Sequence, residues 1–196
     1  GVRDGSASIY YPMWHKDFAN MIVLKNGKGT EENRLRHMDY GVTTNDYLWD
    51  LFLAGRDLAL FDPTEVPDMR DAYYSDPVKF AELYERYAAD PRISKKIVPA
   101  AACFEAFALE RSVTGRIYVL NIDNANSQGP YDRTKHPIKM SNLCAEILLY
   151  TRAFDSVYAY KDVESFLQFA VESGMDEQQA EKIFDAWVEK YVTGRI

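Results

Sequence analysis

The chain has 196 residues, of which 47% are hydrophobic, and its formal net charge is −7. This length and composition predict a globular protein with one sizeable core and exclude an intrinsically disordered chain. The acidic balance argues against a general nucleic-acid-binding protein, and the sequence has neither an apolar run of roughly 20 residues for a membrane span nor a secretory leader. We therefore expect a cytoplasmic protein that has neither a membrane nor a nucleic acid as its partner.

The predicted elements alternate between strands and helices over the first 123 residues. Strands are expected at 7–11, 36–45, 57–61 and 116–123. Helices are expected at 16–26, 46–55, 76–90 and about 98–112. Turn-forming residues predict loops at 62–68 and 124–137. The alternation predicts an α/β layer or barrel and argues against two separate structural classes.

The segment 158–196 has a different pattern, which predicts a helical hairpin. Gly174 is expected to end the first helix, and Asp176 and Glu177 are expected to begin the second. Apolar stripes that could pack on each other or on a partner are formed by Phe166, Leu167, Phe169, Ala170, Ile183, Phe184, Trp187 and Val188.

The cysteines are Cys103 and Cys144, and so small a number argues against a disulfide framework and for a reducing compartment. Cys103 lies on a predicted amphipathic helix, where it is expected to pack in the core. Neither CxxC nor HExxH occurs, so no metal site is expected.

Cys144 lies in "SNLCAEI", residues 141–147, which combines an amide, a thiol and a carboxylate. If the segment is extended, Asn142, Cys144 and Glu146 share one face. The opposite face, which would anchor the segment in the core, would then carry Leu143, Ala145 and Ile147.

A thiol in this setting has three possible chemical uses. A nucleophile needs its thiolate form and a base, and the nearest histidine in sequence is His136. A metal site needs further Cys or His ligands at short spacing. Hydrogen-atom transfer needs a neutral thiol near a base that acts on the substrate, which suits these neighbours best. An amphipathic strand with a packed cysteine is the alternative without chemistry.

Five ordered segments resemble the large, catalytic (alpha) subunit of aerobic, class I ribonucleotide reductases. Together they cover residues 1–157, and they read "GVRDGSASIYYPMWH", "VLKNGKGTEENRLRHMDYGV", "LFDPTEVPDMRDAY", "ERSVTGRIYVLNID" and "MSNLCAEI". The resemblance implies that 1–157 is part of a ten-stranded α/β barrel and that the motif lies on its finger loop. The hairpin at 158–196 does not resemble the family, and its role is unknown.

The resemblance also implies roles for the motif residues. Cys144 matches the thiyl-radical cysteine that takes the 3′ hydrogen atom of a ribonucleotide and later returns one. Glu146 matches the carboxylate that deprotonates the 3′-hydroxyl, and Asn142 matches the amide that hydrogen-bonds the sugar. Ser141 and Leu143 flank that amide in the substrate-binding segment.

The first residues match the end of the loop that relays a bound effector nucleotide to the substrate base. This substrate and effector loop contains Gly1, Val2, Arg3, Asp4, Gly5 and Ser6. In the complete subunit the effectors are ATP and deoxynucleoside triphosphates. We expect no cofactor to be bound by this segment itself.

Family members are several times longer than this chain, and their two redox cysteines and radical-transfer tyrosines have no matches here. We therefore expect an internal fragment or one piece of a split subunit, as some phages encode, in the cytoplasm of the host cell. It would reduce ribonucleoside diphosphates for DNA replication. Its partners would be the remainder of the subunit, a metal-containing small subunit that generates the radical, and thioredoxin or glutaredoxin. The alternative is a truncated, non-catalytic homologue that acts as an interaction module or is a remnant.

Overall fold

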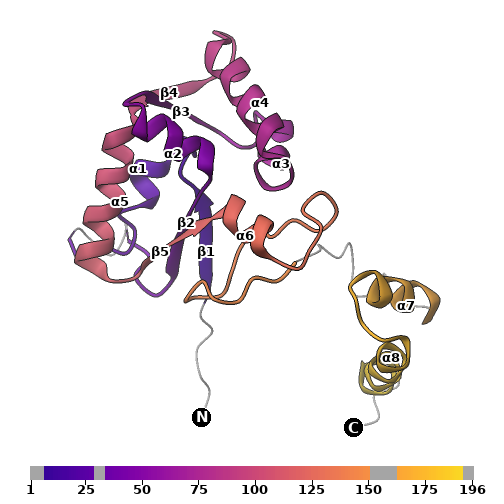
Figure 1. Cartoon of the computed structure of the whole chain (residues 1–196). Helices are drawn as coiled ribbons and strands as arrows, with labels where there is room; N and C mark the ends of the chain where they lie inside the picture. The colour runs from indigo at the N-terminus through magenta and orange to yellow at the C-terminus, as the bar shows by residue number, and fades with distance from the viewer. Residues whose placement is uncertain (1–6, 29–33, 151–162, 192–196) are drawn as a thin grey trace. The chain divides into compact units, whose positions relative to one another are not determined.

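The computed structural model describes residues 7–28, 34–150 and 163–191 (Figure 1). The chain divides into two compact units, 1–151 and 152–196, and each is described by itself. The predicted boundary at 157/158 lies among residues 151–162, outside the described residues. Among the described helices, none has the length and apolar character that a membrane crossing requires.

The first unit contains a parallel three-stranded sheet and an antiparallel pair of strands. The parallel sheet has the order β1-β2-β5, with β1 at Ser8–Pro12, β2 at Asp39–Thr44 and β5 at Ile117–Asn121. The antiparallel pair joins β3, Asp57–Phe61, to β4, Lys95–Pro99. All residues of β2 are buried, as expected for the central strand of a parallel sheet covered on both faces.

Among the described residues of this unit, five helices connect the strands and a sixth follows β5, and side-chain caps explain where several of them begin. The Asn45 carboxamide oxygen accepts a hydrogen bond from the Leu48 backbone N–H (3.1 Å). The Asp76 carboxylate accepts one from the Lys79 backbone N–H (3.0 Å), with Pro77 at the first helical position. The helices are α1 (Phe18–Met21), α2 (Asp46–Leu53), α3 (Pro67–Ser75), α4 (Pro77–Ala89), α5 (Ala100–Thr114) and α6 (Ile122–Gln128).

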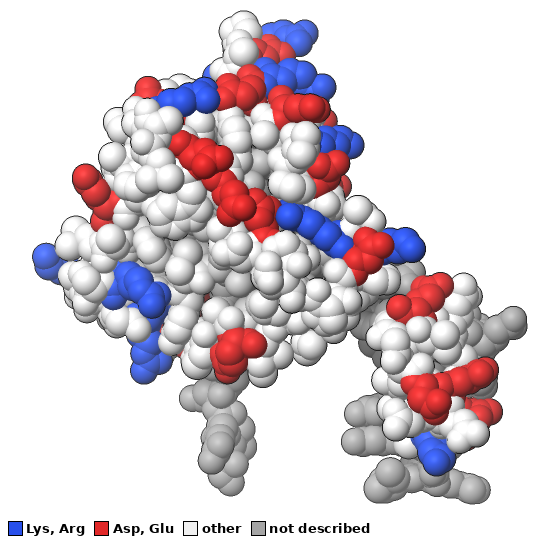
Figure 2. Space-filling view, in the orientation of Figure 1, with Lys and Arg blue, Asp and Glu red and all other residues white. Residues whose placement is uncertain are grey.

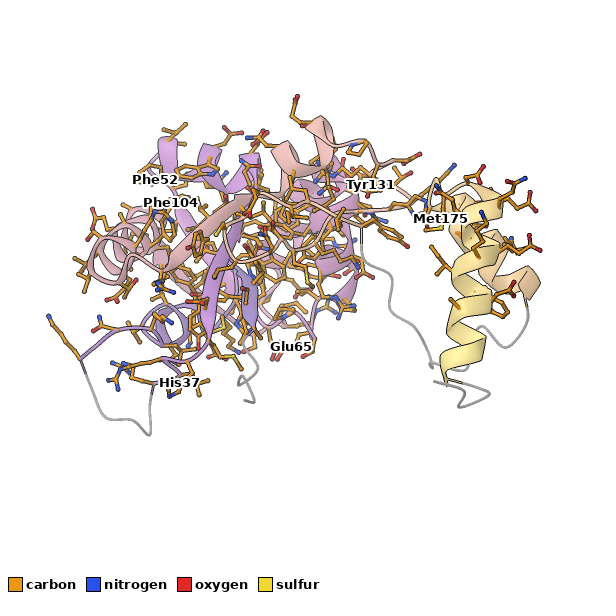
Figure 3. All side chains as sticks on the ribbon, turned by 90° about the horizontal axis from the view of Figure 1, so that it is seen from below. His37, Phe52, Glu65, Phe104, Tyr131 and Met175 are labelled. Carbon is orange, nitrogen blue, oxygen red and sulfur yellow. The ribbon has the colours of Figure 1, made fainter. Side chains whose placement is uncertain are left out.

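Aromatic rings form much of the core. Trp14, which follows β1, packs edge-on against Tyr73 of α3 with 5.7 Å between ring centroids, and Tyr73 lies 5.0 Å from Phe80 of α4. These three side chains are fully buried. Between α2 and α5, Phe52 and Phe104 lie against each other with centroids 4.5 Å apart (Figure 3). Burial of large rings in offset and edge-on contacts is a strong stabilising contribution to a fold of this size.

The surface of the first unit carries charges of both signs. Figure 2 shows Asp and Glu side chains spread over the visible face, with Lys and Arg side chains between them. Exposed pairs such as Arg92 with Asp90 (2.7 Å) contribute little to stability, because solvent screens them. The apolar core is therefore the main source of stability in this unit.

The predicted α/β class is confirmed, and several predicted elements were wrong in detail. The expected helix at 16–26 contains only the four-residue α1, and the expected strand at 36–45 begins at Asp39. Helix α3 begins inside the predicted loop 62–68, where Pro67 marks a helix start and not only a turn. Strand β4 was missed because its lysines resemble a solvated loop, although lysines are common on edge strands.

The predicted loop 124–137 was also wrong at its beginning, which is helical. Strand β5 ends at Asn121, whose side-chain oxygen accepts hydrogen bonds from the N–H groups of Asp123 (2.9 Å) and Asn124 (3.1 Å). The Asn and Asp residues that predicted a loop therefore cap and begin α6.

The second unit contains the predicted hairpin, with α7 at Val163–Glu172 and α8 at Glu177–Tyr191. Gly174 has φ of +82°, and the Asp176 carboxylate accepts a hydrogen bond from the Gln178 N–H (3.1 Å), so the helix end and start are confirmed. Of the predicted apolar stripes, Ala170 and Phe184 are buried, whereas Ile183 is half exposed. Outside the described side chains lie Phe166, Phe169, Trp187 and Val188.

Candidate active site

Residues 141–147 form a turn and not the predicted extended segment. The Asn142 carbonyl accepts a hydrogen bond from the Ala145 N–H (3.1 Å), which closes a four-residue β-turn around Cys144. Ala145 has φ of +64°, a left-handed conformation that is rare for a residue with a Cβ. Ile147 is 50% exposed, so the expected apolar face buried in the core was wrong. The reason is that local hydrogen bonds, and not strand pairing, determine the backbone here.

The turn nevertheless brings the predicted amide and carboxylate together. The Asn142 amide nitrogen donates to a carboxylate oxygen of Glu146 at 2.7 Å. The Asn142 side-chain oxygen accepts from the Ile147 N–H (3.0 Å), and the Ser141 hydroxyl donates to the Ile147 carbonyl (2.7 Å). Cys144 is a free, exposed thiol between these groups in sequence. The arrangement therefore places an exposed thiol, an amide and a carboxylate in one short hydrogen-bonded turn.

Tyr10 of β1 connects this turn to the sheet. Its hydroxyl donates to the Asn142 carbonyl oxygen at 2.7 Å, across 132 positions of sequence. Burial raises the pKa of the Tyr10 phenol, and the nearby charge of Glu146 raises it further, so the phenol stays protonated as a donor. The sequence analysis did not identify Tyr10, and the only signal for it was its position in a segment that resembles the family.

The segment before the turn is held by contacts of two polar side chains. The Asn126 amide clamps Ile138, accepting from its N–H (2.7 Å) and donating to its carbonyl (3.0 Å). Arg133 forms a partly buried ion pair with Asp123 (2.5 Å) and donates to the Tyr74 carbonyl (2.8 Å). These contacts fix the chain between α6 and the turn, so the turn is approached from a defined direction.

The surroundings of His136 and of the acidic side chains bear on the other possible uses of the thiol. The His136 ring packs on Tyr150 with centroids 4.5 Å apart, and no hydrogen bond between described residues joins His136 to Cys144. Within the described ranges, no three His, Cys, Asp or Glu side chains gather in a way that could hold a metal ion.

Two further predictions concern Cys103 and the substrate and effector loop. Cys103 is buried on α5, as predicted, and burial raises its thiol pKa to about 11. The predicted substrate and effector loop lies outside the described residues, and it comprises Gly1, Val2, Arg3, Asp4, Gly5 and Ser6.

Comparison with known protein families gives a match over most of the chain. The family described as "Ribonucleotide reductase, barrel domain" matches residues 1–158. This range includes both sheets of the first unit and the turn that carries Cys144.

Individual relatives give the same result. The alpha subunit of ribonucleoside-diphosphate reductase 1 from Escherichia coli is 45% identical over 152 residues, which are 78% of this chain and 20% of the relative. The Haemophilus influenzae alpha subunit is 44% identical over 157 residues, 80% of this chain and 21% of the relative. This chain thus spans about a fifth of the length of these curated relatives.

A phage relative extends the similarity into the second unit. The alpha subunit from Enterobacteria phage T4 is 44% identical over 184 residues, which are 93% of this chain and 24% of the relative. An alignment of that extent necessarily continues well beyond residue 158. The expectation that the segment 158–196 is unlike the family was therefore wrong with respect to this relative.

Proposed function

Since the chain belongs to the ribonucleotide reductase barrel-domain family, we propose that it is the component of a class I catalytic subunit that carries the thiyl-radical cysteine. Its substrate would be a ribonucleoside diphosphate, because the relatives are named ribonucleoside-diphosphate reductases. The observation that carries this proposal is the 2.7 Å contact of Asn142 with Glu146, which spans the turn that carries the exposed thiol of Cys144.

Each group in the turn has a separate task in this chemistry. The sulfur radical of Cys144 takes the 3′ hydrogen atom, which forms an S–H bond and leaves a radical at C3′. The Glu146 carboxylate accepts the proton of the 3′-hydroxyl, so that the 2′-hydroxyl leaves as water. A dithiol supplies two electrons and two protons and becomes a disulfide: one proton completes the leaving water, and the electrons and the other proton reduce the sugar, which gains a C2′–H bond. Glu146 returns its proton to the 3′ oxygen, and Cys144 returns a hydrogen atom to C3′.

Asn142 suits the role of binding the reacting sugar. Its amide nitrogen has a second N–H beyond the one given to Glu146, and that proton can be donated to a sugar hydroxyl. Its side-chain oxygen is already held by the Ile147 N–H, which fixes the plane of the amide. The Ser141 hydroxyl donates to the Ile147 carbonyl and so joins the first and last residues of the segment 141–147.

The reducing dithiol would come from outside these residues. Cys103 is buried in the core, and its raised pKa of about 11 keeps it protonated and unreactive near neutral pH. The proposed partners are therefore the remainder of the catalytic subunit, with its redox cysteines, and thioredoxin or glutaredoxin to reduce them. A metal-containing small subunit would supply the radical.

The position of β5 at the edge of the sheet supports the proposal that additional polypeptide completes the barrel. Strand β5 lies at the end of the order β1-β2-β5, and among the described strands none pairs with its outer edge. Parallel strands are normally paired on both sides and covered on both faces. In the proposed assembly a further strand of the barrel would pair with β5, and residues 1–6 would transmit the effect of ATP or a deoxynucleotide to substrate choice.

An omission assay with a matched variant tests this proposal. Reduction of a ribonucleoside diphosphate is measured with this chain, a complementing piece of the subunit, the small subunit and a dithiol reductant, and then with each component left out. We expect deoxynucleotide only in the full mixture. Glu146→Gln should lower kcat by roughly 10²-fold or more, the usual contribution of a general base.

Glu82→Gln is the matched control, because Glu82 is an exposed glutamate on α4. This variant should retain the native rate. Equal product formation without this chain would contradict the proposal and favour a non-catalytic homologue, and so would native activity in Glu146→Gln.

A further inference from the structure

We propose that Tyr10 is a positioning residue of this active site, which holds the Cys144 turn in place from a slot that Gly41 creates in the sheet. The inference rests on the proposed function for what the turn does, but the positioning itself is a property of the fold. Its evidence comes from strand register, from the space around Gly41 and from the hydrogen bonds of the turn.

The register of the sheet places Tyr10 against a glycine. Tyr10 of β1 pairs with Gly41 of β2, and Gly41 pairs in turn with Tyr118 of β5. A Cβ added to Gly41 would lie 2.2 Å from Cε1 and 2.4 Å from Cδ1 of the Tyr10 ring. No side chain other than hydrogen fits there unless the ring moves, so the ring lies directly over the Gly41 backbone. Gly41 thus determines the position of the Tyr10 ring and of its hydroxyl.

The Tyr10 hydroxyl contacts the carbonyl oxygen that closes the turn. The Asn142 carbonyl oxygen accepts both the Tyr10 hydroxyl (2.7 Å) and the Ala145 N–H (3.1 Å). Cys144 lies between Asn142 and Ala145 in the turn. Fixing the Asn142 carbonyl therefore limits the movement of the Cys144 backbone. Among hydrogen bonds between described residues, those that join residues 141–147 to the sheet are made by Tyr10, with the Asn142 carbonyl and with Ser141.

The phenol also lies close to the reactive groups. Burial raises the Tyr10 pKa first, and the charges of Glu146, Tyr118 and Cys144 raise it as well, whereas a hydrogen bond with Ser141 lowers it. A single residue connects the hydroxyl to the carboxylate, because Asn142, whose carbonyl the hydroxyl contacts, also donates to Glu146 at 2.7 Å. Tyr10 is therefore placed to orient the turn without taking part in the reaction.

Removal of one oxygen atom tests this role. Tyr10→Phe retains the ring over Gly41 and removes the hydroxyl, with its hydrogen bonds to the Asn142 carbonyl and to Ser141. Hydrogen–deuterium exchange of the full chain is followed in the peptide that covers residues 141–147. We expect exchange of the Ala145 and Ile147 amides to become about fivefold faster, the effect of losing one ordinary hydrogen bond, while β2 amides are unchanged. Tyr118→Phe is the matched control, because none of the hydrogen bonds between described residues uses its hydroxyl.

A second variant approaches the same contact from the other strand. Gly41→Ala should displace the Tyr10 ring and speed exchange in 141–147 at least as much as Tyr10→Phe does. Unchanged exchange in Tyr10→Phe would overturn the inference, and so would an equal increase in Tyr118→Phe.

Activity separates positioning from general destabilisation. In the assembled enzyme, Tyr10→Phe should lower kcat several-fold with KM unchanged, because the thiol is misplaced while the substrate still binds. The exchange experiment needs no turnover, so failure of the proposed reductase function would not affect it. Conversely, unchanged exchange would overturn the positioning role even in an active enzyme.

Discussion

The aromatic core and the Cys144 turn are stabilised by different forces. Trp14, Tyr73 and Phe80 are fully buried and hold strands and helices together by apolar contact. The turn instead has an exposed cysteine and is held by hydrogen bonds from its own residues and from Tyr10. Overall stability and the geometry of the turn are therefore encoded in separate residues. Each can therefore be changed while the other is retained.

The largest expected effect is on the core side of this comparison. Phe80→Ala removes a fully buried ring that contacts Trp14, Tyr73 and Tyr84, so it should lower the free energy of unfolding by about 3–5 kcal/mol. Chemical denaturation of the full chain, followed by circular dichroism, measures this change. A loss below about 1 kcal/mol would show that the core is not the main source of stability.

A smaller effect is expected from the buried thiol of the core, and it depends on pH. The unfolded Cys103 thiol ionises near pH 9, whereas burial raises the folded pKa to about 11. The raised pKa contributes stability that is fully present below pH 9 and is lost as the pH rises toward 11. Relative to Cys103→Ala, the native chain should lose on the order of 2 kcal/mol of unfolding free energy over that range.

Denaturation curves of both proteins at several pH values measure the difference. The variant controls for the other groups that titrate in this range, because it differs only at position 103. Parallel pH profiles would show that the Cys103 thiol is not buried in the manner described.

The sequence predicted the parts of the fold that depend on local patterns. Strand β3 was predicted at its observed bounds, and α4 was predicted from Asp76 and Pro77, because capping and apolar spacing are properties of neighbouring residues. Helix α6 was missed because Asn121 and Asp123 form turns and helix caps equally well.

The candidate site was predictable in composition but not in geometry. The amide and the carboxylate were identified by residue type, but they meet through a turn in which Ala145 has positive φ, a contact that an extended segment does not allow. Tyr10 contacts that turn from 132 positions away, and its place depends on a pairing with Gly41 that no local pattern reveals. Local hydrogen bonds shape the turn and a contact from a distant residue holds it against the sheet, whereas local preference determined most of the elements.

The most direct test compares the two cysteines in the assembled enzyme, because one belongs to each region. Cys144→Ser and Cys103→Ser are each assayed for reduction of a ribonucleoside diphosphate with the complementing piece and the small subunit. A serine hydroxyl cannot replace a thiol in hydrogen-atom transfer, so we expect no product from Cys144→Ser. Because Cys103 is buried in the core and has no proposed role in the reaction, Cys103→Ser should retain turnover once its folding is confirmed. Native activity in Cys144→Ser would contradict the assignment of the thiyl radical to Cys144.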